Sequence, residues 1–464
     1  MEIKTYKIRV EVFLYAFEMK GEKESKKIDL TPWIKNITTD KNINNPSGSF
    51  QISLLPVAKG ESRVPLYYRV SPMDYIEIRF TRDSTLTKTP VVMRGFVDSV
   101  SRMVSTDQNG SPVREYTVSG RDFGKILEIT RIYHIKEFNP DVFLLNLPGS
   151  KNLEAKFNCK IQGSPQEIIE TLLGVAQNQI ELIRKTQQAV PKIKYHGSST
   201  IMGEINEFSL TQEDGSVWNL MRYFDNSPWN ELYITDLEDA PALVFRETPW
   251  KDFKNSNEPV WKNVDEKVKA ATLGESIEIE PGSVMDYSLS RSDAELKNYF
   301  FTYPEQNLFQ GQTSFKKHIL DNVRTENDLN SNPYLIARDD NDAGLNRFGF
   351  RRFENTSEYF ENEKEYKSTE ILSKIFNMAL QKAFKFNGHY ESGSFTIKGN
   401  SEIRPGRYVI FKSNTGVDPE FYVVGVRHTI NLQEGSEQFS TSLTVQRGDG
   451  FLKTRNQISP EAPV

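Results

Sequence analysis

The chain has 464 residues, of which 37% are hydrophobic, 26% charged and 11% aromatic, and its formal net charge is −5. This length predicts roughly two to four domains, and the aromatic content excludes a disordered chain. The mild acidity argues against a general polyanion-binding protein, so we expect no stable nucleic-acid binding.

Cysteine content and local hydrophobicity exclude three further classes. The single cysteine, Cys159, excludes an intramolecular disulfide framework and a cysteine-rich zinc site. No stretch approaches about 18 apolar residues, so we expect no membrane segment. The N-terminus alternates charged and apolar residues, which predicts no signal peptide.

The first third of the chain has the period of β-strands. Apolar residues alternate with charged ones over 8–14, and the pattern recurs at 50–54 and 76–80. Asn109-Gly110-Ser111-Pro112 predicts a turn that joins strands at 97–103 and 113–119. Helical spacing follows at 121–130. A small barrel or curled sheet with one helix against it is expected.

Two helix starts follow. Ser164, Pro165 and Glu167 form a capping-box pattern ahead of an apolar stripe that runs to Ile180, and Ser216 begins a second helical pattern.

The remainder returns to β-structure with long polar interruptions. We expect a hairpin of strands at 230–234 and 242–246, a polar loop over 251–275, and an amphipathic helix over 371–384. Residues 304–367 lack periodicity and predict an irregular insertion, and the chain after Gly450 predicts a loose tail. The other expected strands lie at 277–279, 287–289, 394–397, 408–412, 420–427 and 439–446. The expected class is mainly β with α insertions, with β-rich units at about 1–130 and 216–447.

No catalytic, cofactor-binding or metal-binding constellation is evident. The sequence contains no phosphate-binding loop, dinucleotide fingerprint, GxSxG or HExxH motif. A carboxylate-rich stretch at 339–342 lacks the glutamate that a calcium loop needs. We interpret His428 as an ordinary strand histidine and Cys159 as a small apolar residue. The chain is therefore predicted to be no enzyme.

Several segments are similar to one family. The hairpin contains NELYI at 230–234 and ALVFRETPW at 242–250, followed by YSLSRSD at 287–293. The first β-rich unit contains GFVD at 95–98 and VSGRD at 118–122. The closing part of the second β-rich unit contains RPG at 404–406 and FYVVGVRH at 421–428. In this order the segments resemble the baseplate hub proteins of contractile tails, which include those of myophage tails, R-type bacteriocins and related contractile injection systems.

This resemblance implies two tail-tube-like β-barrel domains per chain. The expected divisions are 1–145 for the first barrel with its short helix, 146–215 for a helical insertion, 216–303 for the first part of the second barrel, 304–368 for an irregular polar insertion, 369–450 for the helix and closing strands of that barrel, and 451–464 for a flexible tail. The residues that carry the family motifs are Gly120, Asp122, Arg246, Trp250, Arg291, Asp293, Pro405, Gly406, Tyr422 and His428.

The resemblance also implies a function. Three chains would form a ring that adapts a sixfold tail tube to a threefold central spike and leaves a conduit after the spike departs. The implied partners are further copies of the chain, the spike, the tail tube protein, the tape-measure protein and a baseplate wedge or LysM-type hub protein. The implied location is the baseplate of a virion tail or injection particle assembled in the bacterial cytoplasm.

Local roles follow for five of these residues. Pro405-Gly406 predicts a tight turn into a strand. Gly120 is expected to break its strand so that Asp122 caps the following helix. Trp250 is expected to be buried together with Leu243 and Phe245.

Two alternatives stay open. A cell-wall hydrolase, or a hub fused to one, would need a catalytic pair and would clear a peptidoglycan suspension. A carbohydrate-binding tail adhesin would expose aromatic platforms and bind a glycan array. Its candidate platforms are Trp33, Trp218, Trp229, Trp250 and Trp261.

Overall fold

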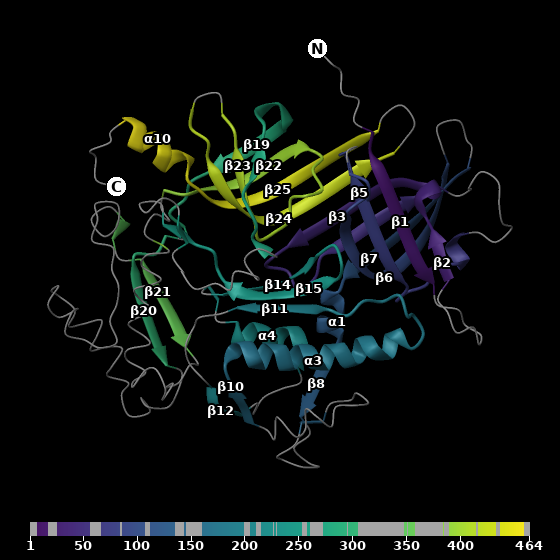
Figure 1. Cartoon of the computed structure of the whole chain (residues 1–464), viewed down its shortest axis with the longest axis horizontal. Helices are drawn as coiled ribbons and strands as arrows, with labels where there is room; N and C mark the ends of the chain where they lie inside the picture. The colour runs from purple at the N-terminus through teal and green to yellow at the C-terminus, as the bar shows by residue number, and fades with distance from the viewer. Residues whose placement is uncertain are drawn as a thin grey trace.

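The structure, a computed structural model, describes residues 7–16, 26–55, 66–83, 86–106, 112–134, 143–144, 160–198, 205–209, 215–225, 227–228, 230–252, 258–259, 272–294, 296–304, 348–349, 351–357, 384, 389–413, 416–432 and 437–458. These residues form three layers, which are a large antiparallel sheet, a small central sheet and a layer of helices (Figure 1). The mainly β class predicted from the sequence is confirmed.

The first β unit occupies the N-terminal part of the large sheet. Its strands have the order β3-β4-β7-β6-β5-β1-β2, and short helices lie at η1 (Thr31–Trp33), η2 (Leu66–Tyr68) and α1 (Gly124–Ile129). The predicted strands and the 97–119 hairpin are confirmed, and their alternation buries one face. The strand bounds are β1 (Arg9–Ala16), β2 (Lys26–Asp29), β3 (Ile34–Asn42), β4 (Ser49–Leu54), β5 (Tyr75–Thr81), β6 (Val91–Thr106) and β7 (Pro112–Asp122).

The second β unit repeats this plan. Its strands have the order β19-β22-β25-β24-β23-β18, which matches β3-β4-β7-β6-β5-β1 position by position, although β18 runs parallel to its neighbour. A short helix precedes the first strand of each unit, and an α-helix follows the third. The bounds are β18 (Ile277–Ile279), η3 (Pro281–Ser283), β19 (Val284–Ser290), β22 (Glu391–Lys398), β23 (Tyr408–Phe411), β24 (Glu420–Asn431), β25 (Gln438–Gly448) and α10 (Gly450–Ile458).

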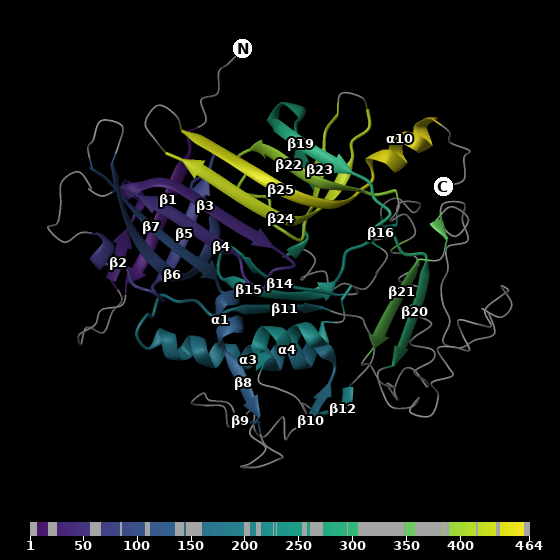
Figure 2. The same cartoon turned by 180° about the vertical axis from the view of Figure 1, so that it is seen from behind.

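The two units join edge to edge. Strand β24 pairs with β3 in antiparallel fashion, from Gly425 opposite Asn42 to Asn431 opposite Asn36. The path of described strands from β19 to β2 is therefore one curved, open sheet (Figure 2).

The central layer is a sheet of β11 (Lys194–Ser198), β15 (Pro241–Glu247) and β14 (Asn230–Asp236). Every residue of β14 and β15 is buried, because the large sheet covers one face and helices cover the other. The predicted 230–246 hairpin is confirmed, and among the described strands β15 pairs with β11 and β14, in a sheet separate from the large one.

Helices α3 (Pro165–Arg184) and α4 (Val217–Phe224) form the outer layer. Both predicted starts are confirmed, with a complete capping box at Ser164 and Glu167 and with the Ser216 hydroxyl accepting the Asn219 N–H. Their apolar faces share one core with the inner face of the hairpin, including Leu232, Leu243 and Phe245.

Three predictions need correction. The chain after Gly450 forms α10 as far as Ile458 and is not loose there. The 304–368 stretch, which was expected to be irregular, contains β21 (Arg352–Ser357), and this strand pairs in parallel with β20 (Tyr299–Pro304). The 146–215 segment contains short strands as well as its helix. The remaining strands are β8 (Arg131–His134), β9 (Phe143–Leu144), β10 (Lys160–Gly163), β12 (Ile205–Ser209), β13 (Gly215–Ser216), β16 (Lys251–Asp252) and β17 (Glu258–Pro259).

Some predictions fall on residues that the structure does not describe. The helix over 371–384, except for Phe384, most of the 304–368 insertion, Cys159, Trp229 and Trp261 lie outside the described residues.

Candidate functional site

A buried arginine links the central hairpin to the second β unit. Arg246 on β15 is 1% exposed, and its guanidinium donates to the carbonyl oxygen of Gly406 at 2.6 Å and to the Thr272 hydroxyl at 2.7 Å. The same group lies 3.4 Å from the carboxylate of Glu231 on β14. A charged group this deeply buried needs such a set of partners to offset its lost hydration.

Two tyrosines complete this cluster. The Tyr422 hydroxyl donates to the Glu231 carboxylate, and burial next to that carboxylate raises the pKa of Tyr422 well above its usual value. Burial raises the pKa of Tyr233 to about 12. Burial alone would lower the pKa of Arg246, but Tyr233, Glu231 and Tyr422 outweigh it and raise the pKa. The arginine therefore stays charged and both tyrosines stay neutral, with the Tyr422 hydroxyl as a donor to Glu231.

The backbone at Gly406 explains the predicted turn. Gly406 has φ +84°, a conformation that disfavours side chains, and a Cβ there would collide with the Tyr233 hydroxyl. The Gly406 N–H donates to the Val423 carbonyl at 2.8 Å as the chain enters β23. The predicted Pro405-Gly406 turn is therefore confirmed, and its carbonyl is the acceptor for Arg246.

A second buried ion cluster links the hairpin to the first β unit. Lys41 on β3 lies 2.6 Å from Asp236, at the end of β14, and 3.0 Å from Asp122, at the end of β7. Burial alone would lower the pKa of Lys41, but the two carboxylates outweigh it and raise the pKa. Arg94 on β6 donates to the carbonyls of Leu237 and Glu238, both at 2.6 Å.

The two clusters together make the hairpin a clamp. At the turn end of β14–β15, Asp236 forms an ion pair with Lys41 of the first unit. Toward the other end of the hairpin, Arg246 donates a hydrogen bond to Gly406 of the second unit. Since the units also pair directly through β3 and β24, they are linked both directly and through the hairpin.

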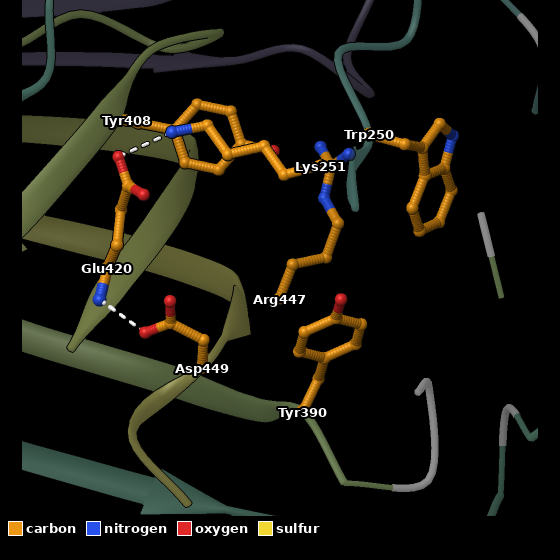
Figure 3. Close-up of a pocket in the computed structure, with 7 residues that line it drawn as sticks. All are labelled: Trp250, Lys251, Tyr390, Tyr408, Glu420, Arg447 and Asp449. Atoms are coloured by element: carbon orange, nitrogen blue, oxygen red, sulfur yellow. Dashed lines mark hydrogen bonds and ion pairs between the residues drawn. The ribbon is translucent and has the colours of Figure 1, made fainter. Parts of the chain in front are cut away.

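An aromatic pocket lies beside the clamp. It is lined by Trp250, Lys251, Tyr390, Tyr408, Glu420, Arg447 and Asp449, as Figure 3 shows, and its volume is about 20 Å³, room for little more than one water molecule. The Arg447 guanidinium lies 3.8 Å from the centre of the Tyr422 ring and 4.6 Å from that of Trp250. Lys251 donates to Glu420 at 2.6 Å. Lys251 and Glu420 therefore neutralise each other, whereas the Arg447 cation lies against aromatic rings.

Trp250 itself differs from its prediction. Leu243 and Phe245 are fully buried as expected, but Trp250 is only half-buried, and it packs against Arg447 and Phe384. Trp250 is therefore part of the wall of the pocket and not part of the core. Trp218, by contrast, is buried in the helical core.

The roles predicted at Gly120 and Asp122 are partly wrong. Strand β7 continues through Gly120 to Asp122, so the glycine does not break it. A Cβ at Gly120 would instead collide with the Phe96 carbonyl and the Phe50 ring. Asp122 does accept the N–H of Gly124, at 2.9 Å, but Phe123 occupies the N-cap position.

The remaining motif residues are spread over the second unit. His428 on β24 is buried, and its Nδ1 lies 3.0 Å from the Thr441 hydroxyl, as a structural histidine would. Arg291 lies over the Phe451 ring at 3.6 Å, and Asp293 pairs with Arg351 at 3.1 Å. Of the ten motif residues, the fold brings together Arg246, Pro405, Gly406 and Tyr422.

Sequence reasoning missed Glu231, Lys41 and Asp236, which supply the opposite charges of the clamp. Each of the three lies in a segment with an ordinary strand pattern. The fold brings Lys41 to Asp236 and Glu231 to Arg246, and no local pattern indicates these pairs.

The described part of the chain holds no group of three or more His, Cys, Asp or Glu side chains placed to bind a metal ion. Among the described helices, none has the length and hydrophobicity needed to cross a bilayer.

No protein-family model and no curated protein sequence matches this chain significantly. Solved structures that resemble it include two tail proteins and one secretion-system component. The 43 kDa tail protein of prophage MuSo2 from Shewanella oneidensis matches with a TM-score of 0.50 at 12% identity, over 94% of this chain and 98% of that chain. The tail protein from Neisseria meningitidis matches with a TM-score of 0.49 at 12% identity, over 95% and 98%.

The third is an E. coli component of the type VI secretion system, described as structurally similar to the bacteriophage T4 tail proteins gp27 and gp5. It matches with a TM-score of 0.39 at 8% identity, over 89% of this chain and 73% of that chain. The fold of this chain is thus similar, over nearly its whole length, to that of a prophage tail protein.

Proposed function

We propose that this chain is the structural hub of a contractile-tail baseplate or a related injection system. Three copies form a ring, and their six β units adapt a sixfold tail tube to a threefold spike. In the assembled ring each unit serves as a tail-tube-like β-barrel. The ring holds the spike before contraction and leaves a conduit when the spike departs.

The observation that carries this proposal is the internal repeat. Two units with one strand order are held edge to edge in a single chain. A threefold assembly of such chains presents six similar units, which a sixfold tube requires. The likeness of the fold to the prophage MuSo2 tail protein supports the same assignment.

The clamp supports a mechanical role. A hub has to keep its units at a fixed angle while a sheath contracts around the tube. A shift of either unit against the hairpin would leave a buried charge unpaired, which is strongly unfavourable.

The proposed partners are the spike, the tail tube protein, the tape-measure protein and a baseplate wedge or LysM-type hub protein. We propose that the protein acts without catalysis and resides in the baseplate of a tail or injection particle.

Electron microscopy of the purified protein tests the proposal. We expect rings with a threefold axis and a central channel, and stacking of tube rings on one face after tail tube protein is added. Particles with only a twofold axis would contradict the proposal. So would a failure of the protein to promote polymerisation of the tail tube protein. Clearing of a peptidoglycan suspension by the purified protein would favour the hydrolase instead.

A further inference from the structure

Two edges of the large sheet have no strand partner among the described residues and carry exposed apolar side chains. Strand β19 pairs with β22 only, within that described part. Residues 91–96 of β6 pair with β5, whereas for residues 99–106 the described strands supply β7 as the one partner. On β19, Met285 and Tyr287 are each 62% exposed, and on β6, Met103 and Val104 are 58% and 56% exposed.

These edges lack the usual protection against pairing. Proteins commonly blunt an exposed edge with lysine, proline or a very short strand. Strand β2, at the other end of the sheet, is such an edge, because it has four residues and two of them are Lys26 and Lys27. Strand β19 has seven residues and contains neither lysine nor proline. Its edge is therefore suited to pair with another strand.

The internal repeat relates each of these two edges to a paired strand of the other unit. In the first strand of each unit the pairing shifts by one residue, between Ile34 and Asn36 in β3 and between Val284 and Asp286 in β19. Aligned on this bulge, Ile37 corresponds to Tyr287.

The fourth strand of each unit carries a bulge as well. It lies between Val97 and Ser99 in β6 and between Val423 and Gly425 in β24. Aligned on it, Val104 corresponds to Ile430. The same alignment matches Phe96 with Tyr422, which oppose Tyr75 and Tyr408 in the next strands.

Within one chain, the fourth strand of the second unit pairs with the first strand of the first unit. In this β24–β3 junction Ile430 lies opposite Ile37, and both side chains are 0% exposed. The corresponding pair, Val104 and Tyr287, lies on the two free edges. The repeat therefore contains one completed junction and the two halves of a second one.

We propose that residues 99–106 of β6 in one copy pair in antiparallel fashion with β19 of a second copy, with Val104 opposite Tyr287. By the same alignment Met103 meets Ser288, and Ser105 meets Asp286. The contact joins different surfaces of the two copies, so it propagates from copy to copy and closes when the rotation allows. It rests on the proposed function, since it supplies the junction that turns three chains into a ring of six units.

Cysteine cross-linking tests the register directly. In a Cys159→Ser background, Val104→Cys protein is mixed with Tyr287→Cys protein under mild oxidation. Directly opposed residues on paired strands are close enough for a disulfide. We expect a covalent dimer in the mixture and little in either protein alone. Ile129→Cys is the matched control, because Ile129 is 44% exposed outside both edges.

The cross-linking results separate the junction from the hub proposal. Equal cross-linking with the Ile129→Cys partner, or cross-linking of Tyr287→Cys protein with itself, overturns the pairing. A protein that forms threefold rings without the expected cross-link overturns this junction but leaves the hub intact. A cross-link found in particles that lack a threefold axis supports the junction and contradicts the hub.

A charge pair provides a second readout that needs no cysteine. Val104→Glu and Tyr287→Lys each place a charge on an exposed edge, so the fold should tolerate them, which circular dichroism checks. Either change alone should weaken self-association at least about tenfold, because it puts an unpaired charge into a strand contact. The two variants mixed should associate better than either alone, and failure of that recovery would count against the register.

Discussion

The Arg246 guanidinium donates a 2.6 Å hydrogen bond to the carbonyl oxygen of Gly406, a residue 160 positions further along the chain. This bond joins the central hairpin to the turn before β23. It requires a glycine in a left-handed conformation on one side and a fully buried cation on the other. The link between the layers therefore depends on a few identifiable side chains.

Replacing Arg246 by methionine should destabilise the protein by about 3–5 kcal/mol, because it leaves the Glu231 carboxylate buried without its cation. Urea unfolding followed by circular dichroism measures the loss. The matched control is Arg427→Met, whose side chain is 61% exposed and whose ion pair with Asp40 spans 3.8 Å. That change should cost less than about 1 kcal/mol, and equal losses at the two sites would contradict the clamp.

Alanine at Gly406 should destabilise the protein more than alanine at Gly416. Gly406 has φ +84° and Gly416 has φ +80°, so both substitutions strain the backbone by about 1 kcal/mol. Among the described residues, the new Cβ would meet a neighbour at Gly406, the Tyr233 hydroxyl, and none at Gly416. Thermal melting of the two variants isolates the steric part. Tyr233→Phe should recover some of it, and a Gly406→Ala variant as stable as Gly416→Ala would show that the turn has room.

His428 should make stability depend on pH. Burial, with the nearby positive charge of Arg404, lowers the pKa of His428 to about 3, against about 6.5 in an unfolded chain. Between these values the unfolded state binds the extra proton. The contribution of His428 is therefore complete above about pH 6.5 and is lost as the pH falls toward 3.

His428→Gln should flatten the pH dependence of the unfolding free energy between about pH 4 and 6.5. His196→Gln is the comparison, because His196 is only half-buried and should account for less of the slope. Denaturant titrations at several pH values provide the measurement. An unchanged slope in the His428 variant would contradict the lowered pKa, because it would mean that the imidazole binds its proton equally well in the folded and unfolded states.

Trp250→Ala should cost less than Trp218→Ala. Trp218 is 5% exposed in the core that α3, α4 and the hairpin share, so its loss should cost about 3–5 kcal/mol. Trp250 is half-buried against Arg447, and roughly 1–2 kcal/mol is expected from the lost apolar area and cation–π contact. Unfolding by denaturant ranks them, and the reverse order would place Trp250 in a core.

The sequence predicts the strands of the large sheet well because one face of each strand is buried. Alternation at Val10, Val12 and Leu14 corresponds directly to burial in β1. Helix starts at Ser164 and Ser216 are equally clear, since the capping groups lie within four residues of one another. Strand β21 escapes prediction because its segment, RFENTS, is mostly polar.

Sheet membership and the clamp are not local properties. The 230–246 hairpin is predictable, but nothing within it specifies that β11 is its neighbour. The internal repeat is hidden for a related reason, because equivalent positions hold unlike residues, such as Ile37 and Tyr287. Lys41 and Asp236 form an ion pair across 195 positions, so no spacing rule connects them.

The most direct test of the central claim is the mass of the purified protein in solution, measured by light scattering over a range of concentrations. The chain has a mass of 53.4 kDa, so the ring predicts a species near three times that value, about 160 kDa. A dimer of about 107 kDa, twice the chain mass, that persists at every concentration would contradict the threefold hub.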